Sequence, residues 1–196
     1  MLAKRIFDLT FTSIGTILLL PFFLLLAIWI KLDSRGPVFF LQTRVGQHGK
    51  LFKIIKFRTM RIDNKGMKLT IGRDARITRS GHFLRKYKLD ELPQLFNVLK
   101  GDMSLVGPRP EVPEYVAHYP DEIKDRVLSV PVGMTDFASI EYSNESEILA
   151  TSLRPEHDYI EKILPLKLAY HQKYVAERSV WLDFLLILRT FKKILP

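Results

Sequence analysis

An uncharged stretch near the start of the chain restricts its fold more than any other feature. No charged residue stands between Leu9 and Ile30, and the part after Ile17 is almost entirely aliphatic or aromatic. A helix of this length crosses the hydrocarbon core of a bilayer. The stretch exceeds the apolar core of a signal peptide, and no small-residue cleavage site follows it. We therefore expect this segment to be retained and to contact lipid.

Two features indicate how the segment meets the membrane. Pro21 lies inside the apolar run, where it removes a backbone hydrogen bond and bends a helix. Cationic residues flank the run on both sides, namely Lys4, Arg5, Lys31 and Arg35. Because Lys and Arg tend to stay on the cytoplasmic side, we predict that residues 1–32 form a re-entrant helix, bent at Pro21. A single straight span is the alternative.

The overall composition favours a membrane surface over nucleic acid as the partner of this basic chain. The 196 residues carry a net charge of +9, but no helix-turn-helix, zinc-finger or RNP-like pattern is present, so we expect no nucleic-acid partner. There is no cysteine, which fits a reducing cytosol. The five histidines are scattered without metal-ligand spacing, and we interpret them as surface or structural residues.

Local patterns predict an α+β fold, with a mostly helical cytosolic, membrane-associated catalytic domain over residues 33–196 and a short β-hairpin. The hairpin is expected from the runs 38–41 and 51–57, separated by Gly46 and Gly49. Helices are predicted at 81–88, 89–99, 120–128, 156–178 (with Pro165 as a kink or boundary) and 180–195. Residues 63–72, 104–111 and 130–144 are expected to be a polar loop, a stiff extended loop and an irregular segment. The apolar stripe of the last helix suits either a core helix or a helix lying in the membrane interface.

The predicted 89–99 helix begins with two adjacent carboxylates, Asp90 and Glu91. Pro93 is tolerated only in a first turn, and Gly101 is a typical stop signal. The start of a helix gathers positive potential and binds anions, of which phosphate is the commonest in biology. Simple helix-end charge would explain the pair taken alone. Phosphate chemistry at this end would require a metal or a covalent step, because the carboxylates themselves repel phosphate.

Four cations on other segments are candidates for holding phosphate groups: Lys56, Arg58, Arg85 and Arg109. A carboxylate that attacks an anionic phosphorus needs its repulsion cancelled by a divalent metal and by Arg or Lys side chains. Arg109 stands between two prolines, which suits a rigid clamp. Neighbouring side chains on a helix diverge by about 100°, so one carboxylate can face phosphorus while the other binds metal.

An ordered set of motifs over the first 110 residues or so resembles the bacterial sugar transferase family, the monotopic polyprenol-phosphate phosphoglycosyl transferases in their small, single-domain form. The motifs are Lys4-Arg-Ile-Phe-Asp8, Lys31-Leu-Asp-Ser-Arg-Gly-Pro-Val-Phe-Phe40, Gln42-Thr-Arg-Val-Gly46, Phe52-Lys-Ile-Ile-Lys-Phe-Arg-Thr-Met60, Asp74-Ala-Arg-Ile-Thr78, Gly81-His-Phe-Leu-Arg85, residues 89–101 and Asp102-Met-Ser-Leu-Val-Gly-Pro-Arg-Pro110. Several motifs in order are far more specific than any one of them.

The resemblance implies transfer of a sugar 1-phosphate from a nucleoside diphosphate sugar, with a UDP-sugar as the expected donor, to polyprenol phosphate. This would be the first membrane step of glycoconjugate synthesis, at the cytosolic face of the bacterial inner membrane. By resemblance, Asp90 attacks phosphorus and forms a phosphosugar-enzyme intermediate, and Glu91, next to Asp90, helps to bind Mg²⁺. Lys56, Arg85 and Arg109 would contact phosphate groups, and Pro21 would break the membrane helix.

Three departures from the family pattern bear on these expectations. Leu20 replaces the usual Ser before the proline, and Lys88 replaces a frequent Ser or Thr before the acidic pair. The segment Gly133-Met-Thr-Asp-Phe-Ala-Ser-Ile-Glu-Tyr-Ser143 also differs from the common pattern, so the sugar cannot be copied from relatives. Its polar residues Asp136, Ser139 and Glu141 are candidates for sugar or nucleotide recognition, with ordinary surface polarity as the alternative. A homodimer, and a non-catalytic membrane-anchored adaptor, both stay open.

Overall fold

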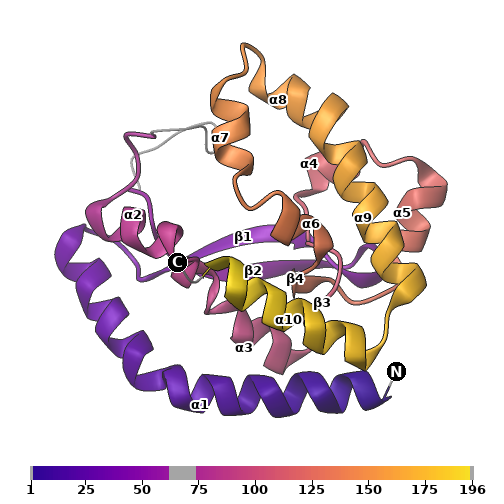
Figure 1. Ribbon diagram of the computed structural model, residues 1–196. Helices are drawn as coiled ribbons and strands as arrows, with labels where there is room; N and C mark the ends of the chain where they lie inside the picture. Colours follow the sequence, from indigo (N-terminus) through magenta and orange to yellow (C-terminus); the bar gives the residue numbers. More distant parts are fainter. Residues whose placement is uncertain (1, 62–73, 195–196) are drawn as a thin grey trace.

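The computed structural model describes residues 2–61 and 74–194, so the polar loop expected at 63–72 lies outside the described residues. The elements follow in the order α1 (Leu2–Asp33), β1 (Phe39–Val45), η1 (Gln47–Gly49), β2 (Leu51–Phe57), α2 (Arg79–Lys86), η2 (Leu89–Glu91), α3 (Gln94–Lys100), β3 (Ser104–Val106), α4 (Pro113–Val116), α5 (Asp121–Leu128), β4 (Gly133–Thr135), α6 (Phe137–Glu141), α7 (Glu145–Ala150), α8 (Pro155–Asp158), η3 (Tyr159–Ile163), α9 (Leu164–Glu177) and α10 (Val180–Ile194). Helices predominate, and α1 borders the rest of the molecule (Figure 1). The mostly helical fold with a short antiparallel sheet is as predicted.

The predicted hairpin is present as strands β1 and β2. They pair antiparallel from Phe39 opposite Phe57 to Val45 opposite Leu51. The connection contains the short helical turn η1, and Gly49 there has a left-handed backbone with φ 75°. Glycine adopts this conformation without steric cost, which explains its place in the turn.

A side chain, rather than a third strand, pairs with the backbone of β2 on the side of α3. The Asn97 side-chain oxygen accepts a hydrogen bond from the Ile55 N–H at 3.0 Å, and its amide nitrogen donates to the Lys53 carbonyl at 2.8 Å. Asn97 is only 1% exposed. These two bonds fix the position of α3 against the strand that carries Lys56.

A second, parallel sheet joins two segments that the sequence predicted to be loops. Strands β3 and β4 pair Ser104 with Gly133 and Val106 with Thr135, and α6 follows β4. The prediction of an irregular segment over 130–144 is therefore wrong in part. A Cβ added at Gly133 would lie 2.0 Å from the Gly107 nitrogen, so the two backbones touch where the strands meet. Because the two strands are far apart in the sequence, local sequence patterns do not reveal this contact.

Helix α1 is a continuous, curved helix with Pro21 inside it (Figure 1). It is long and apolar enough to cross a membrane by length and composition, yet only 22% of its most hydrophobic window is buried in the protein. Its exposed large apolar residues are Leu2, Ile6, Phe11, Ile14, Ile17, Leu18, Leu20, Leu24, Leu25, Ile28, Trp29 and Leu32. A core helix would be mostly covered, so this surface favours contact with lipid. That α1 re-enters one leaflet, with a straight span as the alternative, stays a prediction.

The other side of α1 packs into the core of the domain that follows it. Phe23, Leu26 and Ile30 share one buried cluster with Phe57 of β2 and Leu84 of α2. The segment of residues 1–32 is therefore not a detached element, because its second half belongs to the same packed unit as the strands and helices that follow.

The C-terminal helices also combine two environments. Pro165 stands at the start of α9, directly after a π-helical turn, which makes it a boundary rather than a mid-helix kink. In α10, Asp183 and Leu186 are buried against the domain, whereas Trp181 and Phe191 are 67% and 60% exposed. One face of α10 is therefore a core face, and the opposite face is apolar and open.

We predict that Asn97→Ala destabilises the protein by about 1 to 3 kcal/mol, because it removes a buried side chain and leaves the Ile55 N–H and the Lys53 carbonyl of β2 without their partner. Thermal unfolding in detergent measures this change. Asn144→Ala is the matched control, since Asn144 is exposed and makes no side-chain cap to α7. Equal unfolding temperatures for the two variants would contradict the assigned role of Asn97.

Candidate active site

The acidic pair lies at a junction between two helical turns. Asp90 and Glu91 end the 3-10 turn η2, which is preceded by Lys88 in a left-handed conformation with φ 54°. Pro93 then stands at the N-cap of α3, and Gly101 ends that helix with φ 96°. The predicted single helix over 89–99 is therefore a short turn followed by a helix. Lys88 supplies no side-chain cap, consistent with its replacing a Ser or Thr.

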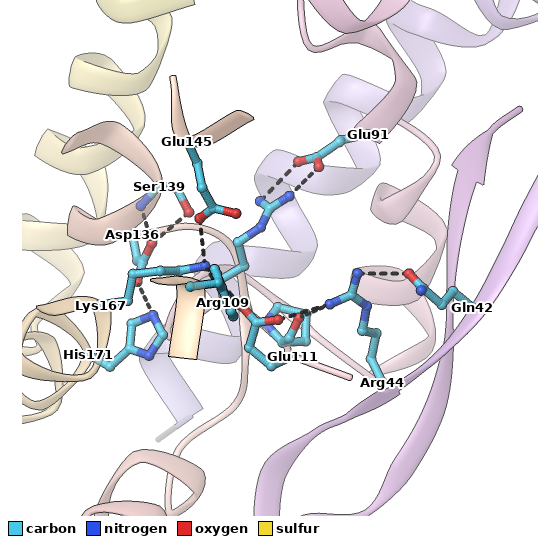
Figure 2. Close-up of polar contacts among 12 residues, drawn as sticks. Gln42, Arg44, Glu91, Arg109, Glu111, Asp136, Ser139, Glu145, Lys167 and His171 are labelled. Carbon is cyan, nitrogen blue, oxygen red and sulfur yellow. Dashed lines mark hydrogen bonds and ion pairs between the residues drawn. The ribbon is translucent and has the colours of Figure 1, made fainter. Parts of the chain in front are cut away.

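Glu91 is held by two cations from other segments. Arg109 forms two hydrogen bonds with its carboxylate, one of them from Nη1 to Oε2 at 3.1 Å (Figure 2). Lys56 of β2 donates to Oε1 at 2.7 Å. Burial alone would raise the pKa of Glu91, but the charges of Arg109 and Lys56 hold it well below 4.5. Glu91 is consequently an ionised carboxylate at neutral pH.

Asp90 is in a different electrostatic state from its neighbour. Asp90 is 9% exposed, and its carboxylate makes no hydrogen bond or ion pair within the described parts of the chain. Burial raises the pKa of Asp90 above its usual value, and the negative charge of Glu91 raises it further. The charges of Lys56 and Arg85 act in the opposite direction. The pair thus contains one paired carboxylate and one that is buried and available.

Three of the four predicted phosphate-binding cations are gathered around this pair. Lys56 and Arg109 touch Glu91 directly. Arg85 comes from α2, where its Nε donates to the Thr59 hydroxyl at 2.9 Å, and its charge acts on Asp90. The structure therefore brings together cations from β2, α2 and the Arg109 loop around one carboxylate pair.

Arg58 is placed elsewhere, contrary to the expectation that it binds phosphate with the others. Its guanidinium is buried at the end of α1 and donates to the carbonyls of Ser34 at 2.8 Å, Arg35 at 2.7 Å and Pro37 at 2.6 Å. These carbonyls lie directly after α1, and Nη2 also lies 3.5 Å from the carbonyl of Ile30 in the last turn of the helix, where a cation complements the helix dipole. Arg58 thus ties the end of the membrane helix to β2, two residues from Lys56.

The loop that carries Arg109 is anchored by a buried polar network. Glu111 accepts hydrogen bonds from the Tyr159 hydroxyl at 2.7 Å and from Lys167 at 2.9 Å, and Arg44 contacts its other oxygen at 3.3 Å (Figure 2). Despite its burial, these cations and the hydroxyl lower the pKa of Glu111 to about 2. Sequence reasoning missed this network. The only local signals are a Glu directly after a Pro-Arg-Pro run and a Lys inside an apolar helix.

Two of the three candidates for sugar or nucleotide recognition are occupied inside the protein. Asp136 is fully buried and caps α6, accepting from the Ser139 N–H at 2.8 Å and from its hydroxyl at 2.7 Å. His171 of α9 lies 3.0 Å from the other Asp136 oxygen and is itself fully buried, as a structural histidine would be. Burial opposes ionisation of Asp136, but His171 and Ser139 lower its pKa. Glu141 alone is exposed, at the end of α6.

The acidic pair suits magnesium only with help from a substrate. Among residues 2–61 and 74–194 no group of three or more His, Asp or Glu side chains is arranged to hold a metal. Mg²⁺ usually takes one or two protein carboxylates and completes its shell with water and phosphate oxygens. Asp90 and Glu91 fit that donor set, whereas a cage made by the protein alone does not.

Comparison with known proteins identifies the family. A family model described as bacterial sugar transferase matches residues 1–196. The chain belongs to the bacterial sugar transferase family. The family model covers the whole site described above, including Lys56, the acidic pair and Arg109.

Named relatives in this family act on different sugars. A UDP-N-acetylgalactosamine-undecaprenyl-phosphate N-acetylgalactosaminephosphotransferase of Aeromonas hydrophila is 38% identical, over 98% of this chain and 43% of its own length. UDP-glucose:undecaprenyl-phosphate glucose-1-phosphate transferases of Escherichia coli strain K12 and Caulobacter vibrioides are 36% and 37% identical. They are matched over 98% and 99% of this chain, and over 40% and 70% of their own lengths. The chain thus spans less than half of the Aeromonas and Escherichia proteins.

The two carboxylates should respond oppositely to neutralisation. Above its folded pKa, ionised Asp90 pays a burial penalty, so Asp90→Asn should stabilise the fold by roughly 0.5 to 2 kcal/mol near pH 7.5. Glu91→Gln should destabilise it by about 3 kcal/mol, because two cations lose their buried partner.

The pH dependence follows from the direction of each pKa shift. The gain in Asp90→Asn should shrink as pH falls through the raised pKa of Asp90 and vanish below pH 3.8, where the carboxyl is protonated in both the folded and the unfolded protein. The loss in Glu91→Gln is present above pH 4.5 and shrinks only as pH falls through the depressed pKa of Glu91. Thermal unfolding of each variant against pH measures both. Destabilisation of the same size in both variants would refute the assignment of Glu91 as the paired carboxylate and Asp90 as the unpaired one.

Proposed function

We propose that the protein transfers a sugar 1-phosphate from a nucleoside diphosphate sugar to polyprenol phosphate through a covalent intermediate on Asp90. The observation that carries this proposal is the asymmetry of the acidic pair. Glu91 is neutralised by Arg109 and Lys56, while Asp90 keeps a carboxylate with no hydrogen bond in the described chain, amid positive charge. A nucleophile must have a free lone pair and a site that tolerates an approaching anion.

The chemistry proceeds in two displacements at one phosphorus. An Asp90 oxygen bonds to the phosphorus that bears the sugar, the bond from that phosphorus to the bridging oxygen breaks, and nucleoside monophosphate leaves with the electron pair. A phosphate oxygen of polyprenol phosphate then attacks the same phosphorus and the Asp90 carboxylate departs. The product is a polyprenol diphosphate sugar, and Asp90 is regenerated.

The surrounding cations are assigned to the charge of the diphosphate. Arg109 and Lys56 contact Glu91, and the charges of Lys56 and Arg85 act on Asp90. Their fixed positions would stabilise the negative oxygens of the transferring group without reorganisation during the reaction. We assign Mg²⁺ binding to Glu91 and Asp90, and when bound the metal would neutralise phosphate charge.

The donor is proposed to be a UDP-sugar, as the names of the relatives indicate for those proteins. Their identities of 36% to 38% are too similar to select between N-acetylgalactosamine and glucose. With Asp136 and Ser139 occupied in the α6 cap, the exposed Glu141 is the remaining candidate of the three for contact with sugar or nucleotide.

We place the protein at the cytosolic face of the bacterial inner membrane, held by α1 and by the open face of α10. This setting would present the site to a lipid-linked acceptor and a soluble donor at once, as the first membrane step of glycoconjugate synthesis requires. The exposed apolar surface of α1 and the flanking cations support this placement.

Release of nucleoside monophosphate from a UDP-sugar panel tests the reaction. We expect release to require Mg²⁺ and polyprenol phosphate for turnover, and to fall at least roughly a thousand-fold in Asp90→Asn. Asp121→Asn is the matched control, an exposed carboxylate in the first turn of α5. Full turnover in Asp90→Asn would exclude the nucleophile, and no release with any donor would favour a non-catalytic adaptor.

Cysteine labelling tests the topology of α1, since the chain has no cysteine of its own. We expect cysteines placed at Leu2 and at the exposed Arg35 to react with an impermeant reagent from the same side as one at the exposed Asp121. A straight crossing predicts that the Leu2 position reacts from the opposite side. Membrane vesicles of both orientations supply the comparison.

A further inference from the structure

A cavity of about 640 Å³ lies between the first turns of α1 and α10, separate from the acidic pair. The two helix starts lie side by side (Figure 1), and Lys4 of α1 contacts Asp183 of α10 at 2.8 Å. Arg5 lines the cavity and donates to the carbonyls of Val98 and Leu99 at the C-terminal end of α3. The acidic pair precedes the N-terminal end of that helix. The cavity and the candidate active site therefore lie at opposite ends of α3.

The floor of the cavity is a satisfied polar network. Lys4 lies 2.7 Å from Asp8 and 2.8 Å from Asp183. Ser104 donates to Asp8, and Tyr174 donates to Asp183, each at 2.8 Å. Both carboxylates are almost fully buried. These groups satisfy one another's charges and hydrogen bonds. The charges at the mouth of the cavity therefore determine which ligand it favours.

Two guanidinium groups at the wall have donors to spare. Arg5 uses two of its N–H groups on the α3 carbonyls, and an arginine carries five. Arg178 is exposed, and within the described residues its guanidinium has no hydrogen-bond or ion-pair partner. Counting Lys4 with these two cations against Asp8 and Asp183, the lining has a net charge of +1. The wall therefore favours an anion.

Exposed apolar side chains stand at the same place on both helices. Leu2 and Val180 line the cavity and are 75% and 36% exposed, and Ile6 and Trp181 next to them are 56% and 67% exposed. A Trp beside an apolar surface with cations is typical of the membrane interface. Apolar rim and cationic wall together match a molecule that has an anionic head and apolar chains.

We propose that this cavity binds the headgroup of an anionic glycerophospholipid, with the phosphodiester on Arg5 and Arg178 and the acyl chains along Leu2 and Trp181. The proposal rests on the proposed membrane placement of α1 but not on phosphosugar transfer. A bound lipid would join the starts of α1 and α10, and would hold the far end of α3 through Arg5.

Trp181 provides a reporter, because Trp29 is the only other tryptophan. The Trp29→Phe protein is placed in phosphatidylcholine nanodiscs that contain the same small fraction of either brominated phosphatidylglycerol or brominated phosphatidylcholine. We expect Trp181 emission to be quenched more strongly by the brominated phosphatidylglycerol. Arg178→Gln should reduce that preference about five-fold, the effect of one cation near an anionic lipid.

Arg189→Gln is the matched control, since Arg189 of α10 is exposed, as Arg178 is, but does not line the cavity. It should retain the preference. Equal quenching by the two brominated lipids, or an equal loss in Arg178→Gln and Arg189→Gln, would overturn the site and leave only diffuse surface charge. Asp90→Asn should keep the lipid preference while losing sugar transfer, so failure of one proposal is distinguishable from failure of the other.

Discussion

The Glu91 carboxylate, shared between Arg109 and Lys56, is the interaction on which the site depends. It joins β2, η2 and the loop after β3, which come from separate parts of the chain. Each of the three groups would be costly to bury alone, because a charge without a partner in a protein interior loses its hydration. When they are buried together, the two cations and the carboxylate offset each other's loss of hydration. Glu91 therefore serves the architecture of the site before any metal or substrate arrives.

A second constraint is the connection between α1 and the acidic pair. Arg58 bonds the carbonyls at the end of α1, and Lys56 stands two residues earlier, on β2. Asn97 then fixes that strand against α3. The end of α1 and the Lys56–Glu91 contact are therefore linked through one strand and its hydrogen bonds.

The sequence predicted the elements whose cues are local and contiguous. The hairpin, the end of α3 at Gly101 and the grouping of Asp90 and Glu91 with Lys56, Arg85 and Arg109 follow from turn residues, charge and ordered motifs. Arg58 and Asp136 were expected at the site and are instead buried partners of helix ends. A residue type states what a side chain can bind, but the choice between a substrate and a nearby backbone depends on tertiary contacts. The β3–β4 pairing was missed for the same reason, because its partners are far apart in the chain.

The division of the acidic pair also explains why two adjacent carboxylates suit this position. Two paired carboxylates would be stable but poorly nucleophilic, and two free ones would repel each other and any phosphate. Lys56 and Arg109 contact Glu91, and the charges of Lys56 and Arg85 also act on Asp90. On the proposed function, these cations would offset the charge of an anionic donor. Burial and the charge of Glu91 raise the pKa of Asp90, which indicates that its ionised form is poorly solvated, a common property of functional carboxylates. On the same proposal, Glu91 holds the site together and Asp90 is the nucleophile.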